Sequence, residues 1–492
     1  MSKQTLPPVD RRAVLGAALA GGVGVAVARL VGLRRVVEVD PPQNTAEAVK
    51  AQNGLDWVSP LGDEATRVAH LLRRTTFGYT TSELEAAVTD GYRRTLDRLI
   101  ETPPADPPPL AGAEDAAPGN GLRLVDLQTW AIDRMIASPT PFAERMTLFW
   151  HGIFTSDFRK VGLQYPYLYW QDLTWRKFFL RDLRSIIYDM TVDPGMLRYL
   201  DLGQSSGANP NENFSRELLE LFTLGAGNYT EDDVKAAARA LAGWREPRTP
   251  ALIQAFVDEA IKRTGAAPKV VPTADTVKAG VFEPNRAYRG TDLTFLGLKK
   301  KWDTPSVLDR ILEQDSAAPF MVRRVLDEFV GPIIDDATVT RLSDRFRQSR
   351  YDMKTLMSDV FTSPEFMRGS YRSMVRSPME FMVATAKALE APALSRFIVG
   401  QSPSMGQTLF DPPSVGGWPT NAGWISSNTM LARINFATAA VQQVKKVPSS
   451  NNAHAQFLDS TLSSQTLSLL NIANDDKRRW TALLCCPEFQ LK

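Results

Sequence analysis

Apolar residues recur at helical intervals through most of this chain, with polar residues between them. Because a helix packs through one face, apolar side chains at positions i, i+3, i+4 and i+7 indicate amphipathic helices. This spacing predicts helices within 63–101, 122–136, 141–153, 166–192, 213–224, 230–244, 307–389 and 426–445, and two short helices near the C-terminus. We therefore expect a mainly α fold, a large multi-helix array.

Three stretches interrupt the helical pattern. Residues 29–60 are polar and punctuated by proline, which is typical of a tether. Residues 102–121 are too rich in Pro and Gly for a packed element and predict a linker. Residues 245–302 contain scattered prolines and short β-branched runs. We expect a small irregular or β-containing insert there, with a hairpin as one option.

Residues 1–28 have the pattern of an export signal. Arg11 and Arg12 precede a Gly/Ala-rich apolar run over 13–28, which ends in the small-x-small pattern that a signal peptidase needs. The run is short for a membrane span. The arrangement resembles a twin-arginine signal peptide, which exports folded proteins. An ordinary secretory signal and an uncleaved anchor flanked by Arg29 are the alternatives.

Export predicts a periplasmic or extracellular location, with a membrane tether if the signal is not cleaved and no transmembrane span if it is. The whole chain has 57 Lys and Arg against 55 Asp and Glu, a formal net charge of +2. Cleavage after Ala28 would remove Lys3, Arg11 and Arg12 together with Asp10, and would leave no net charge. This balance argues against a nucleic-acid-binding protein, which usually has a basic excess.

Cysteine and histidine are scarce. The two cysteines, Cys485 and Cys486, are adjacent, so the chain has neither a disulfide framework nor a CxxC metal site. The three histidines, His70, His151 and His454, are too few for a His-rich metal centre. The sequence identifies no cofactor.

The segment 209–225 holds the densest group of polar candidates. In a helix that begins near Glu212, Asn213, Glu217 and Glu220 would share one face, opposite an apolar face of Leu and Phe. Two carboxylates and an amide on one stripe could hold a hard cation or supply an acid/base pair. The alternative is an ordinary amphipathic helix in which Glu212 and Arg216 form a supporting ion pair.

His151 is the second candidate, at the end of a predicted helix and directly after Trp150. It could act as a general base or ligand. It could equally donate a hydrogen bond to a carbonyl at the helix C-terminus.

The loop over 412–424 is the third candidate, because it holds Trp418 and Trp424 among several glycines. Tryptophans on such a loop can stack on sugar rings or other flat faces. The alternative is a tryptophan that fills the core while the glycines permit its turn. A further pair, Arg73 and Arg74, is predicted to be solvated.

Five segments of the chain resemble a bacterial family. They are His70-Leu71-Leu72-Arg73-Arg74-Thr75-Thr76-Phe77-Gly78, Phe149-Trp150-His151 with Lys160-Val161, the stretch from Asp193-Pro194 to Tyr199-Leu200-Asp201, the stretch from Asn209-Pro210-Asn211-Glu212 to Gly243-Trp244, and the stretch from Pro412-Pro413 to Trp424-Ile425. The family is the domain-of-unknown-function family numbered eighteen hundred. The resemblance implies an exported protein and a single helical domain over 61–492, and it implies no settled activity.

The chain also departs from the family pattern. A stretch in which the resemblance expects a His-Asp pair and a Lys reads Tyr288-Arg289-Gly290-Thr291-Asp292-Leu293-Thr294-Phe295-Leu296-Gly297, without that pair and without the Lys. A family histidine appears as Phe178. The asparagine expected after Tyr-Leu-Asp appears as Leu202. A histidine-dependent centre would therefore be incomplete here.

Two functions fit these observations. The first is an exported factor that binds or assembles with a partner protein or a polysaccharide of the cell envelope. The second is an extracytoplasmic hydrolase or metal-dependent enzyme that uses His151, Glu212, Glu217 and Glu220. The catalytic hypothesis requires His151, Glu217 and the Trp418 loop to meet in one concave pocket.

Overall fold

Side-chain caps fix where most helices of this protein begin. A computed structural model describes residues 60–331 and 334–492, so the predicted signal and tether lie outside the described residues. Asp63, Asp182, Thr230 and Ser426 each accept a hydrogen bond from a backbone N–H in the first turn of the helix that follows. Thr230 and Asp233 form a capping box at the start of their helix.

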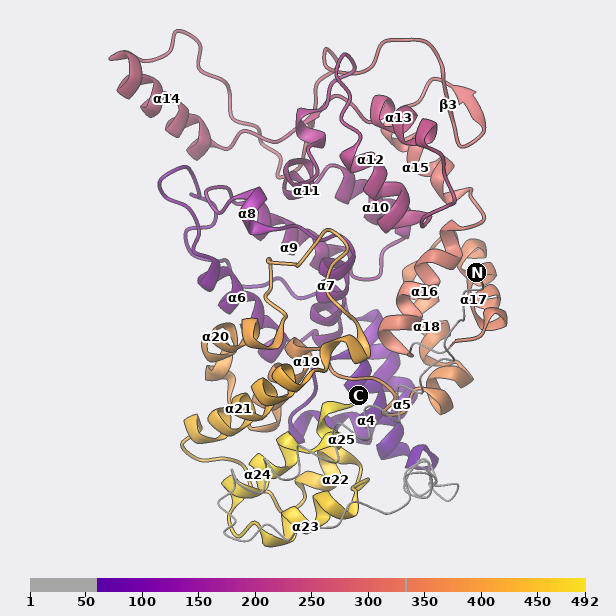
Figure 1. Ribbon diagram of the computed structural model, residues 1–492, viewed down its shortest axis with the longest axis vertical. Coiled ribbons are helices and arrows are strands. Elements are labelled where there is room, and N and C mark those ends of the chain that lie inside the picture. Colours follow the sequence, from indigo (N-terminus) through magenta and orange to yellow (C-terminus); the bar gives the residue numbers. More distant parts are fainter. Residues whose placement is uncertain (1–59, 332–333) are drawn as a thin grey trace, which may run out of the picture. The chain divides into compact units, whose positions relative to one another are not determined.

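The chain divides into two compact units, each built from separate stretches of sequence. Unit 1 holds the described residues up to Asp97, Pro364–Gln407 and Pro419–Lys492; unit 2 holds Arg98–Ser363 and Thr408–Trp418. The elements carry the labels of Figure 1. The mainly α prediction is confirmed. The single domain over 61–492 stays a prediction.

Within the described residues, every secondary-structure element of unit 1 is a helix. They are η2 (Pro60–Gly62), α4 (Glu64–Thr75), α5 (Thr81–Glu101, which continues into unit 2), η5 (Glu365–Gly369), α19 (Pro378–Ala388), η6 (Pro392–Leu394), α20 (Ser395–Met405), η7 (Asn421–Trp424), α21 (Ser427–Gln443), α22 (Ala453–Leu458), α23 (Ser464–Ile472), α24 (Asp476–Cys485) and α25 (Pro487–Gln490). The predicted helix over 426–445 is α21. The C-terminal stretch holds α22 to α25 where two helices were predicted.

Unit 2 contains the helices of the predicted 122–244 region and the strands. They are α6 (Leu124–Ala137), α7 (Pro141–Ile153), α8 (Phe158–Val161), α9 (Tyr167–Phe178), α10 (Leu183–Thr191), α11 (Pro194–Tyr199), η3 (Leu202–Gln204), α12 (Asn213–Glu217), η4 (Leu218–Thr223), α13 (Glu231–Ala240), β1 (Trp244–Arg245), α14 (Pro250–Thr264), β2 (Val281–Phe282), β3 (Leu293–Phe295), β4 (Leu298–Lys300), α15 (Thr304–Leu312), α16 (Ala317–Phe329), α17 (Asp336–Gln348) and α18 (Met353–Phe361).

The predicted helix over 166–192 is two helices, α9 and α10. Phe179 between them adopts a left-handed backbone conformation with φ of 35°, which ends α9. Asp182 then caps α10. Apolar spacing continues across the break because both helices bury residues on the core side, which is why the sequence pattern does not reveal it.

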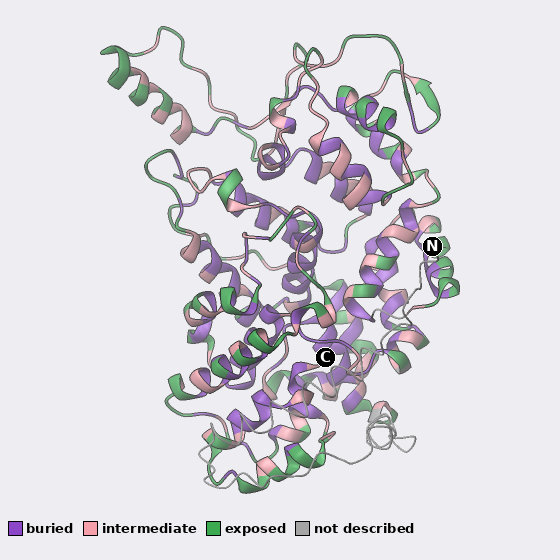
Figure 2. Ribbon diagram, in the orientation of Figure 1, coloured by how far each residue is buried: buried purple, intermediate pink, exposed green. Residues whose placement is uncertain are grey.

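The predicted insert over 245–302 contains a hairpin and a helix. β3 pairs antiparallel with β4, and β1 pairs antiparallel with β2. The helix α14 was not predicted; it has no buried residue and appears only in exposed and intermediate colours in Figure 2. Thr249 caps it and Gly265 ends it in the left-handed conformation.

The proline-rich stretch 102–121 forms no helix, as predicted, but it packs against the unit. Ala113 and Ala116 are fully buried. The indole N–H of Trp130 donates to the carbonyl of Pro108 at 2.7 Å. A proline-rich segment can pack in this way because side chains of neighbouring helices satisfy its backbone carbonyls.

Candidate functional site

The segment that the sequence singles out lies on unit 2 at an unusual helix. α12 continues directly into η4, which is a π-helix. A π-helix has more residues per turn than an α-helix and is frequently found at functional sites. Phe214, Leu218 and Phe222 are buried, which confirms the predicted apolar face. The change of helix type lies between Glu217 and Glu220, so the predicted α-helical stripe is altered at that point.

Glu217 and Glu220 lie close enough to influence each other. Glu217 is half-buried, and burial followed by the nearby Glu220 carboxylate raises the pKa of Glu217. Glu220 accepts a hydrogen bond from the hydroxyl of Tyr229 at 2.6 Å. Burial and this hydrogen bond raise the pKa of Tyr229 to about 12, so the phenol keeps its proton at neutral pH.

Arg216 pairs with carboxylates on both sides. Its guanidinium donates to Glu231 at 2.6 and 2.8 Å, and it lies 3.5 Å from Glu212. The bidentate pair with Glu231 joins α12 to the first turn of α13. The predicted Glu212–Arg216 ion pair is therefore present, but Glu231 is the closer partner.

Residues of two other motif segments join this region. The Lys160 ammonium lies 2.8 Å from the Asp201 carboxylate, and the amide of Asn213 donates to the same carboxylate at 3.4 Å. Burial, then the charges of Asp157 and Glu217, raise the pKa of Tyr199. We call the set Lys160, Tyr199, Asp201, Asn213, Arg216, Glu217, Glu220, Tyr229 and Glu231 the Glu217 surface, because every member is at least partly exposed.

His151 is buried elsewhere in unit 2 and holds the loop 408–418. Its Nε2 accepts a hydrogen bond from the backbone N–H of Phe410 at 3.0 Å. Its ring stacks on Trp175 with centroids 4.4 Å apart, and its centroid lies 4.9 Å from that of Trp418 in a near-perpendicular arrangement. Burial lowers the pKa of His151 to about 3, so the ring is neutral at neutral pH.

The loop approaches the end of α7 closely. Gly417 has a φ of +84°, and a Cβ on it would lie 2.5 Å from the carbonyl oxygen of Gly152. The Thr155 hydroxyl donates to the carbonyl of Val415 at 2.6 Å. His151 therefore lies under a closely packed loop. Neither a hydrogen bond, an ion pair nor a ring contact among residues 60–331 and 334–492 joins it to Glu217.

The predicted binding tryptophans differ in burial. Trp150 is fully buried in unit 2, where it stacks on Phe154. Trp424 is buried in unit 1. Trp418 is half-buried and packs against the His151 ring with the two ring planes 78° apart. Of the three, Trp418 has the most surface that a ligand could reach.

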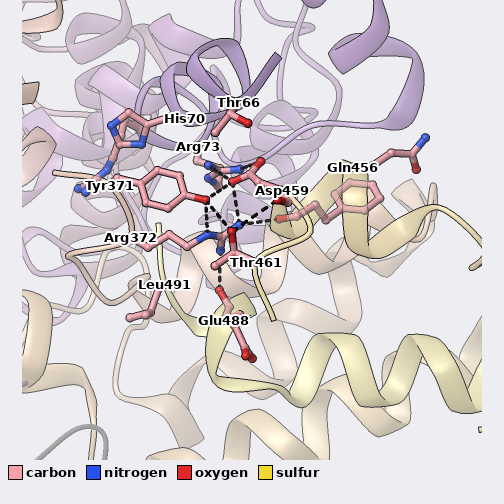
Figure 3. Close-up of polar contacts among 12 residues, drawn as sticks. Thr66, His70, Arg73, Tyr371, Arg372, Gln456, Asp459, Thr461, Glu488 and Leu491 are labelled. Atoms are coloured by element: carbon pink, nitrogen blue, oxygen red, sulfur yellow. Dashed lines mark hydrogen bonds and ion pairs between the residues drawn. The ribbon is translucent and has the colours of Figure 1, made fainter. Parts of the chain in front are cut away.

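Unit 1 contains a buried cluster of charges that sequence reasoning missed (Figure 3). Asp459 accepts hydrogen bonds from Arg73 at 2.6 and 3.0 Å, from Arg372 at 3.1 Å and from the hydroxyl of Tyr371 at 2.8 Å. Burial acts to raise the pKa of Asp459, but the two arginines outweigh it and lower the pKa to about 2. We call these four residues the Asp459 cluster.

The prediction of a solvated arginine pair at Arg73 and Arg74 is wrong, since both side chains are buried. His70, one turn before them, is buried too, and its Nε2 lies 2.8 Å from the hydroxyl of Ser370. Burial, then Arg74 and Arg73, lower the pKa of His70 well below its usual value. The first motif segment is therefore a core element of unit 1.

Residues 60–331 and 334–492 contain no group of three or more His, Cys, Asp or Glu side chains placed to hold a metal ion. Within the same ranges, no helix combines the length and the apolar character needed to cross a membrane. Cys485 and Cys486 are both buried and free.

The comparisons with known proteins agree with the motif segments. The family model described as protein of unknown function (DUF1800) matches residues 70–491, which include parts of both units. No curated protein and no solved structure shows significant similarity to the chain. With a match over most of its length, the chain belongs to the DUF1800 family.

Proposed function

We propose that this protein is an exported factor that binds a partner protein of the cell envelope through the Glu217 surface. The observation that carries the proposal is that three motif segments, which contribute Lys160, Tyr199–Asp201 and Asn213–Glu220, place their polar side chains together on one accessible region of unit 2.

The chemistry of the Glu217 surface suits a protein partner. It combines Arg and Tyr, which are enriched in protein interfaces, with charges of both signs. Interspersed charges give specificity because a wrong partner meets like charges. Its ion pairs are only partly buried: the Arg216 and Glu231 side chains are 36% and 64% exposed, so a partner could rearrange them at low energetic cost.

Binding is tested with a charge reversal. Proteins cross-linked to the wild-type chain in the envelope fraction would be identified, purified and titrated against Glu217→Lys. We expect the purified partner to bind Glu217→Lys at least tenfold more weakly than it binds wild type. The matched control is Glu259→Lys, an exposed position on α14. Equal affinity for wild type and Glu217→Lys, or the absence of any purified protein that binds, would reject this surface as an interface.

Export rests on the sequence of residues 1–28. We expect the double variant Arg11→Lys, Arg12→Lys to remain in the cytoplasm if the twin-arginine route is used, because that route reads both guanidinium groups. Cell fractionation with immunoblotting measures this. Unchanged export of the double variant would favour an ordinary secretory signal.

A hydrolase that uses Glu217 and Glu220 without His151 is a second candidate because of one observation. Burial and the neighbouring Glu220 raise the pKa of Glu217. A raised pKa favours the protonated carboxyl group that a general acid needs. Under this hypothesis Glu217→Gln abolishes hydrolysis of peptide or saccharide substrates without changing the melting temperature. Wild-type protein without activity on such substrates would leave binding as the function.

A further inference from the structure

A pocket in unit 2 is lined by four aromatic side chains and by no residue of the Glu217 surface. Its volume is about 250 Å³. It lies between the end of α13, the paired strands β1 and β2, and the start of α15. Figure 1 labels α13 and α15. The side chains that line it and matter here are Arg239, Trp244, Phe282, Tyr288, Trp302 and Asp303.

The aromatic rings are held in place by the fold. Trp244 and Phe282 face each other across the β1–β2 pair, with ring centroids 5.3 Å apart. The indole N–H of Trp244 donates to the Thr304 hydroxyl at 3.0 Å. Trp302 donates its indole N–H to the carbonyl of Leu293 at 2.8 Å. Since both indole N–H groups are occupied, these rings offer the pocket carbon surface in fixed orientations.

These rings remain accessible, unlike the tryptophans of the core. Phe282 is 43% exposed, and Trp244, Tyr288 and Trp302 are half-buried. By contrast, Trp150 and Trp175 in the same unit are fully buried. A group of accessible aromatic rings around a concavity is typical of a ligand site, because apolar surface that folding leaves uncovered usually has a partner.

The charges of the pocket select among ligands that bind aromatic rings. Asp303 caps α15 and accepts hydrogen bonds from Ser306, so its carboxylate is already engaged. Arg239 is exposed, and its guanidinium has neither a hydrogen-bond nor an ion-pair partner within the described residues. The Lys300 ammonium lies 4.2 Å from the centroid of the Trp302 ring. The Asp303 carboxylate is charged, but hydrogen bonds from Ser306 and the nearby Lys300 compensate it. The uncompensated charge of the pocket is therefore that of Arg239, which is positive, and this disfavours an organic cation and favours an anionic group.

We propose that this pocket binds one sugar ring of an acidic saccharide. The C–H face of the sugar packs on the aromatic rings, whose faces carry partial negative charge. A carboxylate on the sugar pairs with Arg239, whose guanidinium can donate two parallel hydrogen bonds. The volume is below the roughly 300–1,000 Å³ of pockets that hold drug-sized ligands. It therefore suits a single ring, and the rest of the polymer would extend outside the pocket.

The proposal is tested by calorimetric titration with trigalacturonate, a uronic acid trimer, in parallel with maltotriose, a neutral trimer, and choline, an organic cation. We expect trigalacturonate to bind more tightly than maltotriose by at least tenfold and choline not to bind. Phe282→Ala should weaken the affinity for trigalacturonate at least tenfold. Its matched control is Phe256→Ala on α14, because Phe256 is 49% exposed and lies outside the pocket.

Arg239→Ala separates the charge from the aromatic contact. We expect this variant to bind trigalacturonate no better than maltotriose, while Arg263→Ala, at an exposed position on α14, binds as wild type. Melting curves confirm that each variant is folded. Binding of choline in preference to the sugars, no binding of trigalacturonate, or equal affinity for Arg239→Ala and wild type would overturn the proposal. Glu217→Lys should bind trigalacturonate as wild type does, so failure here is distinct from failure of the proposed protein interface.

Discussion

The Asp459 cluster and the Glu217 surface both gather charged side chains, but they differ in burial. In the Asp459 cluster the Arg73 and Asp459 side chains are 0% and 3% exposed. On the Glu217 surface the charged groups are partly solvated. A buried charge that loses its partner is strongly destabilising, whereas an exposed ion pair contributes little. The same residue types are therefore buried in unit 1, where the fold depends on them, and accessible in unit 2.

The largest expected effect is at Asp459. Asp459→Asn removes the charge while keeping the shape, and leaves Arg73 and Arg372 buried without a carboxylate. We expect a loss of about 3–5 kcal/mol in the free energy of unfolding, measured by urea denaturation. The control is Asp232→Asn, whose side chain is 94% exposed and 3.8 Å from Lys235. A loss below about 1 kcal/mol at Asp459 would mean that the cluster does not differ from a surface pair.

The second effect is at His151, where stability depends on pH. The unfolded chain binds a proton on this histidine at about pH 6.5, whereas the folded protein does so only near 3. Between these values the unfolded state holds more protons, so stability falls by about 1.4 kcal/mol for each unit that the pH falls. The variant His151→Phe removes this dependence.

At neutral pH we expect His151→Phe to be less stable than wild type by about 1–3 kcal/mol, because the buried N–H of Phe410 loses its acceptor. The deficit should shrink as the pH falls toward 4. Burial raises the pKa of Asp193 to about 7, which gives an opposite slope, but Asp193 is present in both proteins and cancels in the difference. A deficit that stays constant from pH 7 to pH 4 would contradict a neutral buried His151.

Helices were predictable where residues at their ends, such as a cap, a proline or a glycine, mark their limits. α7 begins with Pro141 in its first turn and spans the predicted residues 141–153. α14 carries comparable signals, with Thr249 as its cap, Pro250 in its first turn and Gly265 after its end. It was missed because the prolines of the surrounding segment outweighed those signals. The residues at the ends of each helix therefore contain enough information to predict both α7 and α14.

The candidate sites depend on contacts that no local pattern contains. Arg73 reads as a surface residue because its partner, Asp459, is 386 residues away in the sequence. The spacing of the apolar residues does not indicate the π-helix that begins at Leu218. The aromatic pocket joins Trp244 to Phe282 through a strand pair of two residues each, too short to predict. Long-range pairing therefore limits what the sequence reveals of function.

A smaller effect is expected at Arg216, in contrast with Arg73. Arg216→Ala removes a bidentate pair with Glu231 that is largely exposed. We expect a loss below about 1 kcal/mol in the free energy of unfolding, and a smaller loss at 1 M salt, where screening shortens the range of the interaction to about 3 Å. Urea denaturation at low and high salt measures both. A loss comparable to that of Asp459→Asn would mean that α12 and α13 depend on this pair.

The smallest effect on stability is expected at Glu217. Its folded pKa is raised, so the folded state binds its proton more readily than the unfolded state, and the charged form at neutral pH opposes folding slightly. Glu217→Gln removes that charge, so the free energy of unfolding should stay within about 0.5 kcal/mol of wild type. Any gain should appear near pH 7 and vanish below about pH 4, where the carboxyl group is protonated in both states. Because stability is spared, a loss of partner binding by this variant would report on the surface itself. A clear loss of stability at neutral pH would instead mean that the charge of Glu217, like that of Asp459, stabilises the fold.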